Sequence, residues 1–344
     1  MTWISTHVGP AVDDVGGIST VLASYQRLGA HGHRLTVLPS YRSTAPLWGL
    51  ALWARAVWVL ITTPRSTLGV VHAHVSRRGS FVREGSLLVI AHLRGCPTCA
   101  TVHGSCFGVN FHRFRPLYLF VLRRADRVVT LTSETQDLLR PLLGADRLVT
   151  IPNPVDAPDH PSPVCRTGPV ALFAGELSRR KGFDVLLEAW ENVQRRIPEA
   201  ELLVVGPVAD VPIRPAPGWR HLGIVDRTEV PHLLDRARLG VLPSRHEAMP
   251  VFLLEAMAAG RPVVSTDVAA IPTIVGDAGI IVPVGDPIAL ADALSHLLGD
   301  AEEAARVGEI GRRRATDRHG LATVAEAVAD LYDQVVRTHD RVPT

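Results

Sequence analysis

The feature that most constrains the fold of this chain is a repeated alternation of short apolar runs with longer helical stretches. In the first half, apolar and β-branched runs predict strands at residues 34–38, 69–75, 98–102, 128–131 and 148–151. In the second half, the same pattern predicts strands at residues 170–174, 201–205, 239–242, 262–265 and 279–282. Strands that alternate with helices form parallel sheets covered by helices. The chain is therefore predicted to be an α/β protein made of two successive units.

A proline-rich segment separates the two halves. Five prolines fall within residues 152–163, where they fix φ and remove backbone donors, so this segment suits neither a strand nor a helix. We expect one domain over residues 1–158 and a second over residues 164–318. Ligands gather beyond the carboxyl ends of the strands in open α/β sheets, so two such units that face each other predict an interdomain cleft.

The charge of the chain is unevenly distributed. Its 344 residues, 47% of them hydrophobic, suffice for two domains with substantial cores. The net charge of +2 hides 16 basic against 9 acidic residues over 1–160, net +7, and 20 against 25 over 161–344, net −5. No helix-turn-helix, zinc-finger or aromatic RNA-binding pattern accompanies the basic half. An anionic membrane surface or a phosphorylated acceptor is therefore favoured over nucleic acid, and a solvated arginine-rich surface is the alternative.

No segment is predicted to cross a membrane. The first residues lack a cationic stretch followed by an apolar core, so we expect no signal peptide and a cytoplasmic protein. The most apolar window, residues 47–63, is short and carries Arg55 in its middle. Trp48, Trp53 and Trp58 recur every five residues, which does not keep them on one helical face. The window is either a partly buried domain helix or an interfacial helix, and the latter would hold the protein on the inner face of the plasma membrane.

A single carboxylate interrupts a predicted apolar helix in the second half. Pro250 suits its first turn and Gly260 with Pro262 ends it, so Glu255 lies among apolar residues, where an ionised group needs a partner. If the residues from Glu247 onward are helical, the two carboxylates stand roughly 12 Å apart along the axis. A nucleotide sugar fits that span, with its hydroxyls on the carboxylates and its pyrophosphate at the helix N-terminus. Helix capping is the alternative, which accounts for Glu247 only.

Lys181 is the only lysine of the chain, against 35 arginines. It lies in a predicted loop, residues 175–182, between an apolar strand and an amphipathic helix. Such a strand, loop and helix can form a phosphate site, in which the lysine supplies a compact charge and Arg179 and Arg180 add forked contacts. An exposed loop is also the ordinary place for a lysine, so this position alone leaves both interpretations open.

Cys96, Cys99, His103 and Cys106 have spacings that could suit zinc, and the first two could suit redox exchange. A buried strand is predicted here, and packing as small apolar groups is the commonest role of such thiols, so both interpretations are disfavoured. The chain also lacks an Asp-x-Asp triplet of the kind that holds a divalent ion on a nucleotide diphosphate. We therefore expect no metal and no cofactor, with leaving-group charge met by Lys181, a neighbouring arginine and backbone N–H groups.

Ordered segments of the chain resemble the retaining glycosyltransferases of family 4, which have the GT-B fold of two facing Rossmann-like domains. In chain order these segments are V-D-D-V-G-G-I-S-T, T-V-H-G-S-C-F, A-D-R-V-V-T-L-T-S, I-P-N-P-V-D, R-R-K-G, H-E-A-M-P-V-F-L-L-E-A-M-A-A-G-R-P-V-V-S-T and A-G-I-I-V-P-V-G-D-P. The resemblance covers nearly the whole chain. It implies a hexosyltransferase that moves a sugar from a UDP- or GDP-sugar to a glycan, lipid-linked or small-molecule acceptor. It also implies that a C-terminal helix, about residues 321–338, packs back on the first domain.

The same resemblance implies roles for individual residues. Glu247 would hold the transferred sugar, Glu255 the ribose and Lys181 the diphosphate. His103 would lie beside the reacting carbon and, with Glu247, form the catalytic set; a strand-end histidine bonded to backbone is the alternative. The implied donor-binding set is Gly16, Gly17, Arg179, Arg180, Lys181, Glu247, Ala248, Met249, Pro250, Val251 and Glu255. Where the family often has an arginine, five residues before the lysine, this chain has Glu176, so Arg179 or Arg180 is the expected substitute.

The resemblance further implies a metal-independent route with retention of configuration. The leaving phosphate accepts the proton of the acceptor, and no protein side chain forms a covalent intermediate. The basic first domain is expected to bind the acceptor through Ser80 and Arg83, with Arg77 and Arg78 nearby, in a segment that resembles members building bacterial surface polysaccharides on lipid carriers. The alternative is a nucleotide-sugar-binding or regulatory protein without turnover, for which Glu176 is the one sign.

Overall fold

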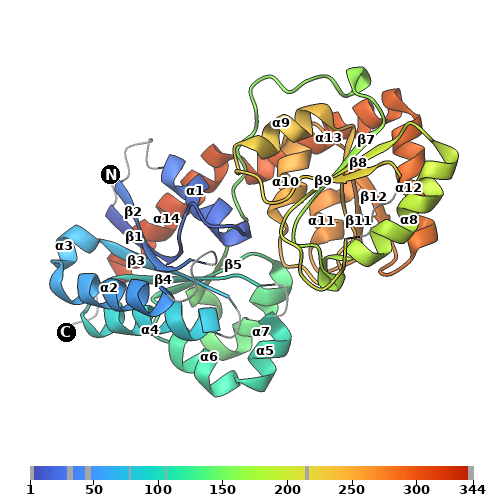
Figure 1. The fold of residues 1–344 in the computed structure, drawn as a ribbon. Coiled ribbons are helices and arrows are strands. Elements are labelled where there is room, and N and C mark those ends of the chain that lie inside the picture. The colour runs from blue at the N-terminus through green and yellow to red at the C-terminus, as the bar shows by residue number, and fades with distance from the viewer. Residues whose placement is uncertain are drawn as a thin grey trace. The chain divides into compact units, whose positions relative to one another are not determined.

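The computed structural model describes residues 4–28, 34–42, 48–76, 79–104, 107–213 and 217–339. The chain forms two compact units, one made of Met1–Pro154 with Leu321–Thr344 and the other of Val155–Gly320. Each unit contains a sheet with helices packed against it (Figure 1), and the strand pairs of the described residues are all parallel. The predicted α/β class with two parallel-sheet units is confirmed.

The first unit has the strand order β2-β1-β3-β4-β5-β6. Its strands are β1 Ile4–Pro10, β2 Arg34–Tyr41, β3 Val70–Val75, β4 Thr98–Val102, β5 Arg127–Thr130 and β6 Leu148–Thr150. Its helices are α1 Gly17–Leu28, α2 Gly49–Thr62, α3 Arg65–Leu68, α4 Gly79–Leu93, α5 Phe107–Arg113, α6 Arg115–Leu122, α7 Ser133–Leu143, the 3-10 turn η3 Ala145–Arg147 and, from the end of the chain, α14 Leu321–His339. The last helix contacts α1 and β3.

The second unit has the strand order β12-β11-β10-β7-β8-β9. Its strands are β7 Val170–Ala174, β8 Glu201–Val205, β9 Trp219–His221, β10 Leu239–Leu242, β11 Val263–Thr266 and β12 Gly279–Val282. Its helices are α8 Phe183–Arg196, α9 Glu229–Arg236, α10 Val251–Ala258, α11 Ile271–Val275, α12 Pro287–Gly299 and α13 Ala301–His319, with 3-10 turns η4 Val164–Arg166, η5 Arg179–Lys181 and η6 Gly276–Ala278. Each strand predicted from the sequence is present, and β1 and β9 are additional.

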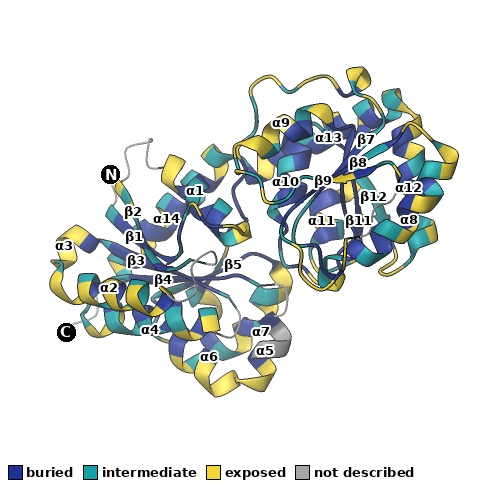
Figure 2. Cartoon of the chain, in the orientation of Figure 1, coloured by how far each residue is buried: buried dark blue, intermediate teal, exposed yellow. Residues whose placement is uncertain are grey.

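The two faces of the first sheet differ in chemistry. Val71, Ala73 and Val75 of β3 belong to the apolar core that includes residues of α2 and α4. Because side chains alternate along a strand, His72 and His74 project to the opposite face, where α1 and α14 contact each other. Both histidines are fully buried, and Figure 2 shows the strands of this sheet as buried between helices. A polar cluster is therefore sealed beneath the C-terminal helix.

The apolar window predicted at residues 47–63 forms α2. Leu60 is fully buried, and the half-buried Trp53 donates its Nε1–H to Ser86 Oγ at 3.0 Å. Trp48 and Trp58 remain 69% and 65% exposed. The window is thus a partly buried domain helix with exposed tryptophans. In the described part of the chain, no helix combines the length and the apolar character needed to cross a membrane.

Candidate active site

Lys181 and Glu247 form an ion pair at the carboxyl edge of the second sheet. Lys181 ends η5, which follows β7, and Glu247 follows β10; the two strands are parallel neighbours, so the loops after them meet. Lys181 Nζ lies 2.5 Å from Glu247 Oε1, and Ser244 Oγ donates to the same oxygen at 2.9 Å. The side chains are only 16% and 8% exposed. The structure therefore brings together the predicted phosphate cation and the predicted sugar-binding carboxylate.

A glycine allows these two loops to approach. Gly182 has φ +69°, and a Cβ built there would lie 1.8 Å from the Pro243 carbonyl oxygen. The backbone N–H of Arg245 donates to the Arg180 carbonyl at 2.9 Å, and Ser178 Oγ accepts from the Lys181 N–H at 3.3 Å. Backbone contacts thus hold the Lys181 loop against the loop that carries Glu247.

The arginines of this region have acidic partners. Arg180 contacts Glu176 at 3.2 Å. Glu176 stands where the family often has arginine, and Arg180 is one of the two arginines expected to replace that arginine, so the two residues pair with each other. Arg245, which sequence analysis did not single out, binds both carboxylate oxygens of Asp184 at 2.7 and 2.9 Å. Burial acts to raise the pKa of Asp184, but the hydrogen bonds and charge of Arg245 outweigh it and lower that pKa. Arg179 is 72% exposed and reaches Asp184 only at 3.7 Å.

Glu255 lies on α10, whereas Glu247 lies before it. Helix α10 begins at Val251 with Pro250 as its N-cap, and residues 243–250 are not helical. The separation of roughly 12 Å derived from continuous helical rise therefore does not apply, because the chain turns before the helix starts. Burial raises the pKa of Glu255 to about 7, while the charge of Arg227 opposes the shift. Among the described residues, no donor is hydrogen-bonded to the Glu255 carboxylate.

The remaining residues expected to bind the donor flank these groups or lie in the first unit. Met249 and Pro250 are buried, and Ala248 and Val251 are partly exposed. The first turn of α10 has neither a side-chain cap nor an acidic residue. In the first unit, Gly17 begins α1 directly after Gly16, whose φ is +141° and whose surroundings leave open space. Both units thus present a glycine or helix terminus of the kind that binds anions.

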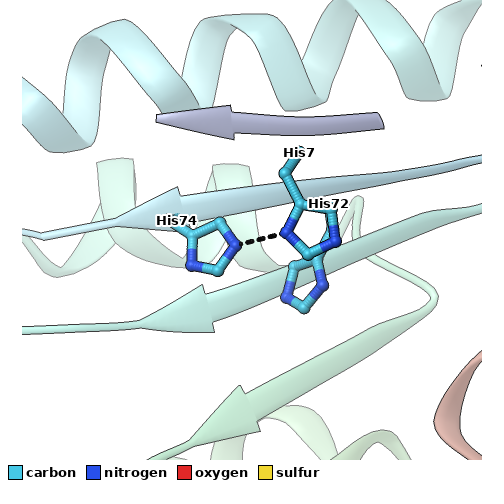
Figure 3. A group of neighbouring side chains, drawn as sticks. All are labelled: His7, His72 and His74. Carbon is cyan, nitrogen blue, oxygen red and sulfur yellow. Dashed lines mark hydrogen bonds between the residues drawn. The ribbon is translucent and has the colours of Figure 1, made fainter. Parts of the chain in front are cut away.

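His103 follows β4 and stands at the end of a chain of buried side chains. Its Nε2 lies 2.9 Å from His74 Nδ1, and its backbone N–H donates to the Val75 carbonyl at 2.7 Å. His74 Nε2 lies 2.8 Å from His7 Nδ1, the contact drawn in Figure 3. His7 Nε2 in turn lies 2.8 Å from the hydroxyl of Tyr332 on α14. The side chain of His103 is therefore bonded to another histidine and not to backbone.

The series of hydrogen-bonded side chains continues beyond Tyr332. Its hydroxyl also lies 2.8 Å from His72 Nδ1, and His72 Nε2 lies 2.6 Å from Thr101 Oγ1. Burial lowers the pKa of His7 and of His103 to about 3. It also lowers the pKa of His72 and His74 well below the usual value, and neighbouring histidines add to both shifts. All four imidazoles are thus neutral at neutral pH. Of these four histidines only His103 was predicted from the sequence, although the H-A-H alternation of β3 is visible there.

The two described residues expected to bind the acceptor, Ser80 and Arg83, contact the carboxylate of Glu84, which was not predicted from the sequence. Ser80 and Arg83 lie on α4, and Arg83 Nε is 2.9 Å from Oε1 of the fully buried Glu84. Ser40 Oγ donates to the same oxygen at 2.5 Å. Burial raises the pKa of Glu84, and the Arg83 charge with hydrogen bonds from Ser40, Ser80 and Arg83 opposes it. The Arg83 guanidinium also lies 4.4 Å from the centre of the Tyr41 ring.

Two predicted residues on this side, Arg77 and Arg78, lie outside the described residues. Cys106 of the candidate zinc set does so too. Cys96 and Cys99 are buried free thiols, and burial raises the pKa of both.

Only one group of metal-binding side chains is found within the described ranges, and it contains no cysteine. Ring nitrogens of His7, His72 and His74 all lie within 4.8 Å of one another. Each nitrogen of these three rings already lies at hydrogen-bond distance from another side chain of the protein.

Known proteins match both halves of the chain. Residues 13–154 match the family model described as "Glycosyl transferase 4-like domain", and residues 168–300 match "Glycosyl transferases group 1". Alpha-D-kanosaminyltransferase of Streptomyces kanamyceticus is 26% identical over an alignment of 358 residues, which covers 90% of each chain. Sucrose-phosphate synthase from Thermosynechococcus elongatus superimposes with a TM-score of 0.74 at 19% identity, covering 98% of this chain and all of that one. Anabaena HepE, solved with UDP and glucose, gives 0.71 at 17% identity, covering 96% and 99%.

Two parallel α/β units with these structural neighbours define the GT-B fold, and the two family models define a glycosyltransferase. Within that class, the chain belongs to the GT4-type enzymes, which pair a glycosyl transferase 4-like domain with a group 1 domain. The GT-B fold, the family resemblance and the assignment as a glycosyltransferase are confirmed.

Proposed function

We propose that this enzyme transfers a hexosyl group from a nucleoside-diphosphate sugar to an acceptor with retention of configuration and without a metal. The observation that carries this proposal is the Lys181–Glu247 pair at the carboxyl edge of the second sheet. Its ammonium suits phosphate oxygens and its carboxylate suits sugar hydroxyls, which are the two chemistries of such a donor. Glu247 Oε1 already accepts from Lys181 and Ser244, so Oε2 is the oxygen assigned to the sugar.

The diphosphate is assigned to the N-terminus of α10 together with Lys181. The uncapped amides at that helix start favour an anion, and the helix dipole adds to them. Arg180 pairs with Glu176, while Arg179 is mostly exposed and reaches a carboxylate only at 3.7 Å. Arg179 is therefore the better candidate for the second phosphate cation. The family resemblance also assigns Gly16 and Gly17 to the phosphates.

Glu255 is assigned to the ribose hydroxyls. Its carboxylate lacks a hydrogen-bond donor among the described residues, and burial holds its pKa at about 7. Such a group gains more from two hydroxyl donors than an exposed carboxylate does, because water competes less for it. This accounts for an acidic residue between the buried Leu254 and Ala256.

The proposed reaction needs no protein nucleophile. The C1–oxygen bond to the diphosphate breaks, the acceptor oxygen attacks C1 from the same face, and the leaving phosphate takes the acceptor proton. Lys181, Arg179 and the α10 amides stabilise the charge that develops on the leaving group. The family resemblance assigns His103 to the sugar. Retention, metal independence and the front-face route are carried by the family resemblance and by this cationic site.

The acceptor is assigned to the basic first unit, as a glycan, a lipid-linked sugar or a small molecule. Arg83 holds Tyr41 and Glu84 in place and is still 22% exposed, so it can contact an acceptor phosphate. The solved complex of HepE with UDP and glucose makes UDP-glucose the first donor to test. The alignment with alpha-D-kanosaminyltransferase adds an amino sugar to the candidates for the transferred group.

We further propose that the enzyme works in the cytoplasm and binds anionic membrane peripherally. Helix α2 and its N-cap expose Trp48, Leu50, Trp58 and Ile61, and α6 exposes Leu117 and Phe120. Exposed aromatic and aliphatic groups on a unit of net positive charge fit an anionic bilayer surface.

Thermal-shift screening with UDP-, GDP-, ADP- and TDP-sugars tests the donor assignment. A donor at 100 times its Kd should stabilise the protein by about 2.7 kcal/mol. The stabilising donor should then be turned over with an acceptor, or hydrolysed slowly, in the presence of EDTA. Activity that disappears in EDTA and returns with Mg²⁺ would contradict the metal-independent route. Binding without turnover across acceptors would instead support a regulatory protein.

A further inference from the structure

We propose that Tyr332 is a positioning residue that, through His7 and His74, fixes His103 in the tautomer with its proton on Nδ1. His103 then acts on the donor sugar as a hydrogen-bond donor and not as a base. What His103 contacts rests on the proposed function, whereas the tautomer follows from contacts inside the first unit alone.

The cluster is built by strand alternation. β1, β3 and β4 are parallel neighbours, with His7 opposite His72 and His74 opposite Thr101 in register. These side chains share one face of the sheet, as His103 does one residue beyond β4. Helix α14 covers that face and supplies Tyr332, which is 325 residues from His7 in sequence.

The hydroxyl of Thr101 sets the donor-to-acceptor direction of the hydrogen bonds in this series of side chains. Two neutral rings that share an N···N contact need one N–H and one lone pair. A neutral imidazole has one of each, so a ring that accepts at one nitrogen donates at the other, and all hydrogen bonds of the series run in the same direction. Thr101 is 1% exposed, and among the described residues its Oγ1 has a hydrogen bond only with His72 Nε2. A buried hydroxyl proton needs an acceptor. Thr101 therefore donates to His72 Nε2, because the opposite polarity would leave its O–H unpaired.

The other proton positions follow from this one and from Ser5, whose hydroxyl hydrogen-bonds the Tyr332 oxygen as a donor. His72 carries its proton on Nδ1 and donates to the same oxygen, so the Tyr332 hydroxyl proton is left for His7 Nε2. His7 then carries its proton on Nδ1 and donates to His74 Nε2. His74 likewise donates from Nδ1 to His103 Nε2. The accepting Nε2 of a neutral His103 leaves its one proton on Nδ1.

His103 Nδ1 has no hydrogen-bond partner among the described residues. The next residue, Gly104, has φ +126° and carries no side chain, so a ligand oxygen can come close to this ring. An Nδ1–H at that place donates to a sugar hydroxyl or ring oxygen, and it cannot take a proton from the acceptor. Proton removal is thereby left to the leaving phosphate.

Tyr332 links His72 to His7, because its hydroxyl accepts from His72 and donates to His7. Tyr332→Phe removes that link and leaves His7, His74 and His103 free to adopt either polarity. Tyr118→Phe is the matched control, because Tyr118 is an equally buried tyrosine of the first unit that packs on Phe81 and has no ring contact with the histidines in the described structure.

The first test is long-range ¹H–¹⁵N NMR of the full chain labelled with ¹⁵N-histidine. His103→Gln identifies the His103 signals. We expect a protonated Nδ1 and an accepting Nε2 for His103, a shift toward mixed tautomers in Tyr332→Phe, and no change in Tyr118→Phe. A protonated Nε2 in the parent protein, or an unchanged His103 in Tyr332→Phe, would overturn the inference. So would stoichiometric metal in the purified protein, since a metal would take ring nitrogens out of the chain.

The second test is kinetic. Tyr332→Phe should lower kcat by about 10- to 100-fold, as loss of a partner that orients a functional histidine does in metal sites, with KM for the donor unchanged. Tyr118→Phe should leave both values in place. Tyr332→Phe should melt lower than Tyr118→Phe because it removes hydrogen bonds to two buried rings, so kcat is compared at a temperature at which both variants are folded. Altered tautomers with an unchanged kcat would overturn the positioning role. If the parent turns over no nucleotide sugar, the proposed function fails, and the NMR result still decides the tautomer.

Discussion

The two oxygens of Glu247 have different surroundings. Oε1 accepts from Lys181 and Ser244, and no described residue is bonded to Oε2. Glu247→Gln keeps the size of the side chain and removes its charge, so it weakens both the grip on Lys181 and the hold on the sugar. We expect kcat to fall about 100-fold or more, the range for loss of one charge-stabilising group. Glu188→Gln, on the exposed side of α8, is the control. A Glu247→Gln enzyme with parental turnover would refute the donor-site assignment.

Glu255 links donor binding to stability. Burial raises its pKa from the usual 4.5 to about 7. Between these pH values the folded state keeps a proton that the unfolded state loses, so stability falls as pH rises through the window and stays lower above it. Glu255→Gln cannot ionise and should unfold at higher urea than the parent at pH 8, with no such gain at pH 4.5.

The gain from Glu255→Gln is at most about 3 kcal/mol, because a unit of pKa shift corresponds to about 1.4 kcal/mol, and screening at this partly exposed side chain reduces it. The same variant should bind the donor more weakly, since an amide is a poorer acceptor for two hydroxyls. Equal urea midpoints at pH 8 would show that Glu255 has no raised pKa.

Sequence alone identified residues whose type conflicts with their surroundings. The only lysine and an acidic residue in an apolar helix were informative by themselves. Contacts between residues far apart in the sequence could not be predicted in this way. Arg245 binds Asp184, which is 61 residues away, and Tyr332 binds His7, which is 325 residues away. Such contacts depend on which strand ends and helices the fold brings together, and residue types do not encode that locally.

At the scale of elements, the turn at Gly182 joins the Lys181 loop to the Glu247 loop. Gly182→Ala would place a Cβ against the Pro243 carbonyl in a backbone conformation with φ +69°. Gly223→Ala is a matched control, because its φ is +75° and nothing lies within 4 Å of the added carbon. Left-handed strain should cost each variant about 1–2 kcal/mol, and overlap should cost Gly182→Ala about 1–3 kcal/mol more.

Chemical denaturation of the two glycine variants measures that difference directly. Gly182→Ala should also lose activity beyond its loss of stability, since the strain moves Lys181 away from Glu247. Equal stabilities would show that the two loops can separate without cost, and the ion pair would then not depend on this turn.

Element prediction succeeded where burial gave a clear apolar pattern. Strands such as β7 and β10 read as continuous apolar runs because both faces are covered. β1 was missed because Ser5, Thr6 and His7 interrupt it, and these polar residues are buried by bonding to other parts of the fold. The spacing between Glu247 and Glu255 was wrong for a related reason, since the helix starts only at Val251 and the turn before it has no periodic pattern.

At the scale of the whole molecule, charge is divided between the units. The unit made of Met1–Pro154 and Leu321–Thr344 has 18 basic and 11 acidic residues, net +7, and Val155–Gly320 has 18 and 23, net −5. The helix that ends the chain adds two basic and four acidic residues with its tail, so the basic excess belongs to the N-terminal segment. An anionic surface should therefore attract one unit and repel the other.

Vesicle flotation tests whether the basic unit binds anionic lipid and whether the exposed tryptophans of α2 contribute to that binding. The protein should float with vesicles rich in anionic lipid, less so with neutral vesicles, and the bound fraction should fall as salt rises, because surface attraction is screened within about 10 Å at 0.1 M salt. Trp58→Gln should reduce flotation at every salt concentration, since it removes apolar area and not charge. Ile224→Gln, which changes a comparably exposed apolar residue in the acidic unit, should not. Equal flotation of the two variants would show that α2 does not contact the bilayer, and the exposed tryptophans would then need a protein or acceptor partner instead.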